Sequence, residues 1–460
     1  MGLGQPGTAI RDGAGRQPPK SALAWGGVAL ARRPAGSPER VKDREGALGG
    51  GARRYVVAMS GVVGRARAAR LVLRVLARRA GVQVVEPGQP DALEPGRPAL
   101  VVHRPGALYT GLAKNVLRGA AESWLEGDWT TPDLGGVVAA FARVTPFRTS
   151  GVLQRFRASA ALVRRAAGND GRTGSSRDQI AHHYDLPTEF FASFLGPMMV
   201  YSAASVPEVE QVRLPELADA ELCDRLAVAQ AKKLTDVLDA AQVGAGSRVL
   251  DLGCGWGSLA LAAADRGASV TAVTLSAGQA DHVRTAGAGV GVEVRNLDYR
   301  QVGGTYDCVT SVEMIEAVGH DHLAAYFGVI ARSLASGGRA VVQAIVMAHG
   351  RAVASVGKTT WIQERIFPGG FIPSLRMIEE AARDAGLVLA DAPRSLREGY
   401  AGTLQLWAEG LRRATSRGEL DGVVTRRAAR EWEFYLEYSR GGFQSAYLDV
   451  LQLTFVEKRR

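Results

Sequence analysis

Short apolar runs and amphipathic stretches alternate along the chain from Gln179 onward. The apolar runs have the length of buried strands, and the stretches between them repeat at helical spacing. The expected strands are Arg248–Leu252, Ser269–Thr274, Val292–Asn296, Tyr306–Val312 and Arg339–Val346, with helices beginning at Gly257, Ala277 and about Asp321. This alternation predicts an α/β fold with a doubly wound, mostly parallel sheet. The last apolar run, Val450–Glu457, is expected to close the sheet as an antiparallel strand.

The chain before Gln179 has a different pattern, which predicts a small mixed α+β domain over residues 59–165. Its expected elements are a helix over 61–80, strands at Val82–Val85 and Ala99–His103, and helices from about Leu108 and from Pro132. Residues 166–178 are polar and rich in Gly and Ser, which favours a linker to a domain over 179–460. No apolar run reaches the roughly eighteen residues of a membrane span, so we expect no transmembrane helix.

The positive charge of the chain is concentrated near its beginning. Lys and Arg number 56 against 46 Asp and Glu, a net charge of +10 over 460 residues. Residues 1–58 carry ten basic and four acidic residues, and residues 59–80 carry six arginines and no acid, so the remainder has a net charge of −2. This nearly neutral body argues against a nucleic-acid partner. Residues 1–58 lack periodicity and are expected to be a disordered basic extension or, if translation starts at Met59, an untranslated leader.

The cysteines and histidines indicate neither a disulfide scaffold nor a metal centre. The three cysteines are Cys223, Cys254 and Cys308, and they form no CxxC pair. This arrangement fits a reducing, cytoplasmic compartment. His182 and His183 have no partner at ligand spacing, which favours a structural role or a place near a bound ligand over a metal site.

The helix expected over residues 61–80 has two faces. One face carries a stripe of arginines, and apolar residues fill the rest of the circumference; the stripe is Arg67, Arg70, Arg74 and Arg78. Such a helix either attaches to an anionic membrane surface or packs on its own domain with its arginines in solvent. The sequence leaves both interpretations open.

The strongest motif joins the strand Arg248–Leu252 to the following helix. An acidic residue is followed by three glycines at alternate positions, and the expected ligand contacts are Asp251, Gly253, Cys254, Gly255, Trp256 and Gly257. Glycines permit a tight turn and a close approach of a ligand to the backbone. The spacing differs from that of dinucleotide-binding loops, and the acid would repel a phosphate but attract a cation. This favours S-adenosylmethionine, which has an ammonium group, a sulfonium and no phosphate, over an ordinary strand-to-helix turn.

Polar residues follow the next two strands at the same edge of the predicted sheet. Thr274, Ser276 and Gln279 are expected to contact the ribose of the cofactor, and Asp298 and Tyr299 are expected to contact its adenine. Surface loops carry such residues anyway, but ligands of α/β folds bind at the carboxyl ends of the strands, where these residues lie.

Further motifs follow in order along the chain: His183–Asp185, Tyr201-Ser202, Ser311–Gly319, Ile366–Gly370 with Pro373-Ser374, Tyr400-x-x-Thr403-Leu404 and Trp432–Tyr447. With the glycine loop and Thr274–Gln279, they resemble the cyclopropane-fatty-acyl-phospholipid synthase family, which includes the mycolic acid cyclopropane synthases, over about residues 82–460. The resemblance implies a class I, Rossmann-like S-adenosylmethionine-dependent methyltransferase with a seven-stranded sheet. It also implies methyl transfer to the double bond of an unsaturated acyl chain in phospholipid, at the inner face of the cell membrane. A homodimer is compatible with it.

The resemblance also assigns residues to the site. Tyr201 and Ser202 belong to the cofactor site, whereas Glu316 and Tyr400 lie at the reacting carbons. There, negative charge and π faces stabilise a cation. Considered as residues alone, Glu316 can instead cap a helix, and Tyr400 can pack with its hydroxyl in solvent.

In the family a bound bicarbonate is thought to accept the proton that the methylated chain loses, and three family positions differ here. Ala203 and Ser439 stand where the family has cysteines, and Gln343 stands where it has a histidine. A thiolate nucleophile at either position is therefore excluded. The backbone N–H of Ala203 and the side chain of Gln343 can still donate hydrogen bonds to bicarbonate, but Gln343 cannot shuttle a proton as a histidine does.

The segments Glu313–Ala317 and Gln343–Ile345 resemble an actinobacterial subgroup linked to 10-methyl branched acids such as tuberculostearic acid. This favours a 10-methylene or 10-methyl branched product slightly over a cyclopropane. A methyl branch needs a separate reductase, because the chain shows no second nucleotide loop.

Two segments are expected to shape the acyl site. A lid insertion is expected at about 355–400, with Trp361–Leu375 either over the acyl channel or in a plain surface insertion. The aromatic stripe of Trp432–Tyr447 is typical of a core and can also form a wall of the channel. Two other functions stay open: a methyltransferase of small natural products, and a non-catalytic lipid-binding partner subunit.

Overall fold

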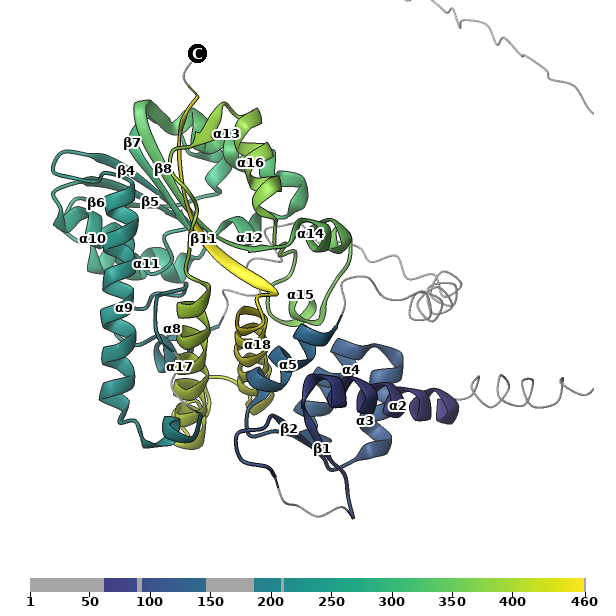
Figure 1. Ribbon diagram of the computed structural model, residues 1–460. Helices are drawn as coiled ribbons and strands as arrows, with labels where there is room; N and C mark the ends of the chain where they lie inside the picture. The colour runs from purple at the N-terminus through teal and green to yellow at the C-terminus, as the bar shows by residue number, and fades with distance from the viewer. Residues whose placement is uncertain (1–61, 89–92, 146–185, 208–210, 459–460) are drawn as a thin grey trace, which may run out of the picture. The chain divides into compact units, whose positions relative to one another are not determined.

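The structure, a computed structural model, describes residues 62–88, 93–145, 186–207 and 211–458 (Figure 1). The predicted extension 1–58, the predicted linker 166–178 and the pair His182 and His183 lie outside these ranges and stay predictions. Within the described ranges, no helix is long and apolar enough to cross a membrane.

Residues 62–145 form a small mixed unit with three strands and four helices in the described ranges. Its elements are α2 (Val62–Ala80), β1 (Gln83–Val85), β2 (Ala99–Val102), α3 (Pro105–Lys114), α4 (Val116–Leu125), β3 (Trp129–Thr130) and α5 (Leu134–Val144). Strand β2 pairs in parallel with β1 and antiparallel with β3.

The pattern from about Leu108 predicted one helix, whereas the structure has two. Asn115 has an extended backbone and caps α4, because its side chain accepts a hydrogen bond from the Arg118 N–H at 3.0 Å. Helices α3 and α4 then cross closely: a Cβ at Gly119 would lie 2.2 Å from the carbonyl carbon of Gly111. The sequence pattern missed this break because Asn115 lies between two stretches of similar helical spacing.

Two arginines of the predicted stripe hold α2 to its own unit. Arg70 and Arg74 both form ion pairs with Glu86, which is 5 % exposed and also accepts a hydrogen bond from the Tyr109 hydroxyl. Helix α2 thus packs on its own unit, but these two arginines form ion pairs where the packing interpretation had placed them in solvent. Other residues of α2 remain exposed, and they are Arg65, Arg67, Leu71, Val72, Val75, Arg78 and Arg79.

An eight-stranded sheet forms the frame of the second half, with the order β10-β11-β8-β7-β4-β5-β6 and with β9 also paired to β11. The strands are β4 (Arg248–Leu252), β5 (Ser269–Thr274), β6 (Val292–Asn296), β7 (Tyr306–Val312), β8 (Leu334–Met347), β9 (Leu387–Leu389), β10 (Arg394–Ser395) and β11 (Leu448–Glu457). Strands β4 to β8 are parallel, and β11 closes the sheet antiparallel to β8, as predicted. The expected count of seven is one too few, because the short strands β9 and β10 pair with different parts of β11.

Helices cover both faces of this sheet. The helices described in this half are α8 (Thr188–Leu195), α9 (Asp219–Ala240), α10 (Ser258–Asp265), α11 (Ala277–Ala286), α12 (Ile315–Val318), α13 (Leu323–Ser333), α14 (His349–Ser355), α15 (Trp361–Arg365), α16 (Leu375–Asp384), α17 (Arg397–Ser416) and α18 (Arg426–Gln444), with 3-10 turns at Gln211–Glu216, Tyr299–Gln301 and His320–His322. On β4, Val249 packs with residues of α9, α10 and α11, whereas Leu250 packs with residues of α13 and α16. Alternate residues thus face two cores, which confirms the doubly wound arrangement.

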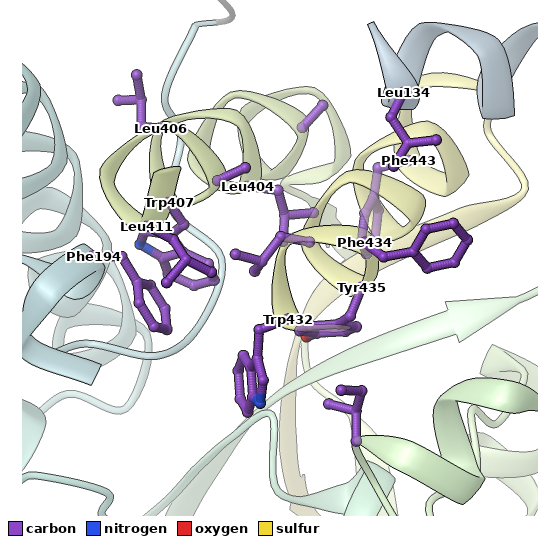
Figure 2. Packing of buried hydrophobic residues seen from close by; sticks show 14 of the residues in the cluster. Leu134, Phe194, Leu404, Leu406, Trp407, Leu411, Trp432, Phe434, Tyr435 and Phe443 are labelled. Carbon is purple, nitrogen blue, oxygen red and sulfur yellow. The ribbon is translucent and has the colours of Figure 1, made fainter. Parts of the chain in front are cut away.

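Helix α18 joins the sheet-based half to the small unit. Its Arg440 is 2 % exposed and pairs with Asp133, at the start of α5, and with Glu437, whose carboxylate also accepts the Gly135 N–H at 3.2 Å. A Cβ at Gly441 would lie 2.7 Å from the Gly135 carbonyl oxygen, so the two helices touch backbone to backbone. Figure 2 shows the aromatic core beside this joint, with Trp407 on α17 and Trp432 on α18.

The expected lid insertion at about 355–400 divides into two parts. Residues 375–395 belong to the frame, because α16 packs on α13 and the strands β9 and β10 pair with β11. The preceding part, with α14 and α15, reaches the small unit, where the Trp361 indole N–H donates to Glu122 of α4 at 3.2 Å. Residues 355–374, here called the narrowed lid segment, are the part of the expected insertion outside the frame, and their role as a lid stays a prediction.

Candidate functional site

The glycine loop between β4 and α10 has the backbone that its sequence predicts. Gly253, Gly255 and Gly257 have φ angles of 79°, 54° and 87°, all in the left-handed region. A Cβ at Gly253 would lie 2.7 Å from Met314, and one at Gly257 would lie 2.7 Å from Val283. A Cβ at Gly255 would meet no atom within 4 Å, and this glycine lines a cavity. The loop therefore turns its bare backbone toward that cavity.

Asp251 places an incompletely bonded carboxylate beside this loop. The residue is 2 % exposed, and its Oδ1 accepts a hydrogen bond from Thr310 Oγ1 at 3.0 Å. Among the described residues, its buried Oδ2 has no hydrogen-bond partner. Burial raises the pKa of Asp251 to about 6, while the nearby Lys233 acts in the opposite direction. A cationic group in the cavity would satisfy the orphaned oxygen, which fits the ammonium group of S-adenosylmethionine.

The residues expected near the ribose and adenine lie beyond β5 and β6. Thr274 Oγ1 donates to Gln279 Oε1 at 2.7 Å, and both residues line the cavity. Asp298 and Tyr299 line it as well, although Asp298 also accepts the Arg300 N–H at 2.9 Å.

The cavity has a volume of about 1010 Å³ and brings most of the predicted residues together. The predicted residues that line it are Tyr201, Ser202, Asp251, Gly253, Cys254, Gly255, Trp256, Thr274, Gln279, Asp298, Tyr299, Glu316 and Tyr400. Four predicted residues do not line it: Gly257, Ser276, Ala203 and Gln343. Gly257 starts α10, and the Ser276 side chain caps α11 by accepting the Gln279 N–H, so both shape the site without forming its wall.

Away from the glycine loop the cavity becomes apolar and reaches the small unit. Its walls there include Leu73 of α2, Leu108 of α3, Leu117 of α4 and Phe141 of α5, with Phe367 from the narrowed lid segment. Leucine and phenylalanine side chains offer no hydrogen bonds, so this part suits a hydrocarbon.

Between these two ends lies Glu316, on the short helix α12. Its Oε1 accepts a hydrogen bond from the Ile345 N–H, whereas its buried Oε2 has no partner among the described residues. Burial, assisted by the negative charge of Glu313, raises the pKa of Glu316 to about 8. A positive charge inside the cavity would favour its ionised form.

Three predicted residues donate hydrogen bonds to the carboxylate of Glu313. Glu313 itself was not predicted as a site residue and belonged only to a segment that resembles the actinobacterial subgroup. The N–H of Ala203 and the Nε2 of Gln343 each donate to Glu313 Oε1 at 2.7 Å, and the Tyr400 hydroxyl donates to Oε2 at 2.9 Å. Glu313 also lines the cavity. The sequence does contain a signal for Glu313, because this carboxylate directly follows β7 and lies three residues before Glu316.

Lys233 is a residue of the site that was not predicted, whereas Tyr435 belongs to the aromatic stripe expected in Trp432–Tyr447. Lys233 of α9 is 3 % exposed and donates to Ser202 Oγ at 2.7 Å, and burial lowers its pKa to about 8. Tyr435 of α18 accepts a hydrogen bond from the Tyr201 hydroxyl at 3.1 Å, and its ring meets Phe367 edge-on at 5.2 Å between centroids. Lys233 comes from a distant helix, so no local motif indicates it. The place of Tyr435 in the wall of the cavity is consistent with the aromatic wall expected from Trp432–Tyr447, and Figure 2 shows Tyr435 near Trp432 on α18.

Cysteine and metal chemistry find little support in the described ranges. Cys254 lies in the glycine loop, where burial raises the pKa of its thiol far above the usual range and keeps it protonated. In the parts of the chain that the structure describes, no group of three or more His, Cys, Asp and Glu residues is arranged to hold a metal ion.

The sheet is doubly wound, an acidic residue and three glycines follow its strand β4, and polar residues follow the next two strands, β5 and β6. This arrangement defines the class of S-adenosylmethionine-dependent methyltransferases. The solved structures of two cyclopropane synthases support this class. MmaA2 of Mycobacterium tuberculosis has a TM-score of 0.52 at 28 % identity, and CmaA1 complexed with SAH and CTAB has a TM-score of 0.53 at 27 % identity. Each comparison covers 62 % of this chain and 99 % of the other.

The sequence comparisons then give the family. Residues 172–453 match the model of the mycolic acid cyclopropane synthetase family, and the chain belongs to this family. It is 39 % identical to the tuberculostearic acid methyltransferase UfaA1 of Mycobacterium tuberculosis over 375 residues, which are 80 % of this chain and 85 % of that protein. It is 31 % identical to the cyclopropane-fatty-acyl-phospholipid synthase of Escherichia coli K12, over 59 % of this chain and 66 % of that protein. The predicted family, enzyme class and cofactor are thereby confirmed.

Proposed function

We propose that this protein transfers the methyl carbon of S-adenosylmethionine to the double bond of an unsaturated fatty acyl chain carried by a phospholipid. The single cavity that joins the glycine loop to the apolar walls of α2, α3 and α5 carries this proposal. It puts a cofactor site and a hydrocarbon site in one continuous space, with Glu316 between them. The names of the two relatives, a tuberculostearic acid methyltransferase and a fatty-acyl-phospholipid synthase, support the same substrate class.

S-adenosylmethionine supplies an electrophilic methyl group when it is bound. Asp251 and the glycine loop hold the cofactor, with Thr274 and Gln279 at the next strand end. Because an alkene is a weak nucleophile, the protein must exclude water and stabilise the positive charge that appears on the chain. The apolar walls exclude water, while the Glu316 carboxylate and the rings of Tyr400 and Tyr435 offer negative and π charge.

For the product, we infer a 10-methylene or 10-methyl branched chain rather than a cyclopropane. The neutral side chain of Gln343, which replaces the family histidine, donates to Glu313 and accepts the Gln452 amide at 3.0 Å. It therefore takes no part in proton transfer, which changes how the proton leaves the chain. A cyclopropane is the second candidate, supported by the names of the cyclopropane synthases among the relatives. A methyl branch would require reduction by a separate reductase.

The test uses purified full-length protein, S-adenosylmethionine labelled in its methyl group, and vesicles of an oleoyl phospholipid. We expect label in the oleoyl lipid and none in matched vesicles of a palmitoyl phospholipid, which has no double bond. Mass spectrometry of the released acids then separates a methylene branch from a ring. Equal labelling of both lipids, or of neither, would refute the proposed substrate, and a ring without any branched species would refute the proposed branch.

The proposal extends to the surroundings of the site. The exposed residues of α2, among them Leu71, Val72, Arg78 and Arg79, form a surface suited to anionic phospholipid at the inner face of the cell membrane. The narrowed lid segment, residues 355–374, would cover the acyl part of the cavity. The small unit described over 62–145 would belong to the domain predicted over 59–165. Light scattering tests whether two copies of the protein associate.

A further inference from the structure

The bicarbonate that the family resemblance implies does not fit this site. Its expected ligands were the Ala203 N–H and the Gln343 side chain, and both donate at 2.7 Å to one oxygen of Glu313. The Tyr400 hydroxyl is bound to the other oxygen at 2.9 Å. A carboxylate that belongs to the chain thus takes the donors that an external anion would need, and no step of the reaction is assigned to bicarbonate.

The backbone at Glu313 has an uncommon, left-handed conformation. Its φ angle is 51°, in a region where side chains other than glycine are uncommon, and such a conformation costs about 1–3 kcal/mol. The Glu313 N–H donates to the Gln343 carbonyl oxygen at 2.8 Å, which ties the end of β7 to β8. Strain that the surrounding hydrogen bonds maintain at a cavity wall is typical of functional positions.

We propose that the Glu313 carboxylate replaces bicarbonate and accepts the proton that the methylated acyl chain loses. This inference rests on the proposed function. It assigns the acceptor role to Oε2, because Oε1 already receives two hydrogen bonds and Oε2 receives one. Glu313 and Tyr400, which donates to this oxygen, both line the cavity that the substrate would enter.

The step balances without a further reactant. The π electrons of the double bond form the new carbon–carbon bond to the methyl group, and the carbon–sulfur bond breaks with its electron pair left on sulfur. For the ring, a C–H bond of the new methyl group gives its electron pair to a bond between the methyl carbon and the cationic carbon. For the methylene branch, a hydride first moves from the methylated carbon to the cationic carbon, and a C–H bond of the methyl group then gives its electron pair to the methylene double bond. The proton passes to Glu313 Oε2 and leaves to solvent after the product departs.

The charges around Glu313 suit a base that works near neutral pH. Burial raises its pKa, while the Ala203 and Gln343 donors, the charge of Lys233 and the Tyr400 hydroxyl act in the opposite direction. The pKa of Tyr400 is raised well above its usual value by burial and by Glu313, so its hydroxyl keeps its proton and remains a donor. Glu316 has one donor and faces the charge of Glu313, so it holds a proton more readily when no cation is present. Glu313 thus receives three hydrogen bonds that stabilise its ionised form, whereas a cation in the cavity would favour the ionised form of Glu316.

Glu313→Gln is the sharpest variant, because it preserves the shape and removes the basic oxygen. We expect its kcat to fall about 100-fold, the scale of general base catalysis, while the Kd for S-adenosylhomocysteine stays within about twofold. Glu293→Gln, at an exposed carboxylate on β6, is the matched control and should leave both quantities unchanged. A Glu313→Gln protein with the kcat of the unmodified protein would overturn the proposal.

Bicarbonate itself provides a second measurement. In buffer freed of carbon dioxide, the unmodified protein should keep its activity, whereas activity that is lost and then restored by added bicarbonate would overturn the inference. Glu313→Gly removes the side chain and suits the positive φ, so it should free the three donors. We expect its activity to rise at least about tenfold on addition of bicarbonate; a variant indifferent to bicarbonate would contradict the idea that Glu313 occupies an anion site.

Binding of the anion also separates this inference from the proposed function. Carbon-13 bicarbonate, observed by NMR, should bind to Glu313→Gly and not to the unmodified protein, whether or not any lipid is methylated. Failure of the unmodified protein to label any unsaturated lipid would refute the proposed function alone. Saturable binding of bicarbonate to the unmodified protein at this site would refute the replacement by Glu313 alone.

Discussion

The two ends of the reaction site are built in different ways. At the cofactor end, one short loop supplies an acid and three glycines in the left-handed region, so the binding surface is mostly backbone. At the reacting end, four separate segments supply Ala203, Glu313, Gln343 and Tyr400, and the backbone N–H of Ala203 and the side chains of Gln343 and Tyr400 donate to the Glu313 carboxylate. A site built from one contiguous segment can therefore be recognised in the local sequence pattern. A site whose residues come from separate segments can be recognised only once the fold is known.

Glu316, between the two ends, gives the largest expected effect. Replacing it by Gln keeps an acceptor for the Ile345 N–H but removes the negative charge that faces the cavity. We expect kcat to fall about 100- to 1000-fold, as for other losses of preorganised charge, with the affinity for S-adenosylhomocysteine unchanged. Steady-state kinetics and calorimetry measure the two quantities. A kcat within about tenfold of the original would mean that the carboxylate is a structural cap, and an equal loss of cofactor affinity would mean that the two ends are not separate.

A change at the cofactor end should instead weaken the binding of the cofactor. Gly257→Ala would need a left-handed alanine, which costs about 1–2 kcal/mol, and its Cβ would lie 2.7 Å from Val283. We expect the affinity for S-adenosylhomocysteine to fall about 30-fold, equivalent to about 2 kcal/mol, together with a lower Tm. Gly303→Ala is the control, because a Cβ there would meet no atom within 4 Å. Unchanged affinity in Gly257→Ala would show that the loop backbone is not what holds the cofactor.

The elements of the fold were largely predictable from sequence, and the cofactor end with them. Apolar runs marked β4, β5 and β7 because each is a mostly buried strand, whereas β6 is only partly buried and alternates apolar with polar residues. The lid expected at about 355–400 stays a prediction, and nothing in the sequence of residues 375–395 distinguishes a helix that packs on the sheet from one that covers a ligand. The role of Glu313 was not predicted because it depends on hydrogen-bond donors from Ala203 and Gln343, which lie 110 and 30 residues away in the chain.

The acidity of Asp251 offers a finer test of the cofactor end. Burial raises its pKa to about 6, so above that pH the carboxylate is ionised and attracts the ammonium group of the cofactor. Below pH 6 it takes a proton and the attraction is lost, so the Kd for S-adenosylhomocysteine should rise about tenfold for each unit of falling pH. Lys233, with its pKa of about 8, stays charged throughout this range.

Asp251→Asn isolates this titration from that of Glu313 and Glu316. The variant keeps an acceptor for the Thr310 hydroxyl, which donates to Oδ1 at 3.0 Å. Its Kd at pH 7.5 should resemble that of the unmodified protein at low pH and should change little between pH 5 and 7.5. A variant with the full pH dependence of the unmodified protein would place the titrating group elsewhere in the cavity.

The smallest expected effect concerns α2, where two pairs of arginines differ in their partners. Arg78 and Arg79 are exposed, whereas Arg70 and Arg74 form ion pairs with the buried carboxylate of Glu86. A basic residue at an anionic membrane surface is worth about 1 kcal/mol. Replacing Arg78 or Arg79 by Gln should therefore weaken binding to phosphatidylglycerol vesicles about fivefold each, with a smaller loss at higher salt.

The same substitution at Arg70 or Arg74 tests the contrast directly. Each would leave Glu86, which is 5 % exposed, with one fewer positive partner, so we expect a lower Tm and little change in vesicle binding. Co-sedimentation with vesicles and thermal unfolding separate the two outcomes. If all four substitutions weaken vesicle binding equally, the arginine stripe acts as one surface, and the ion pairs with Glu86 do not divide it.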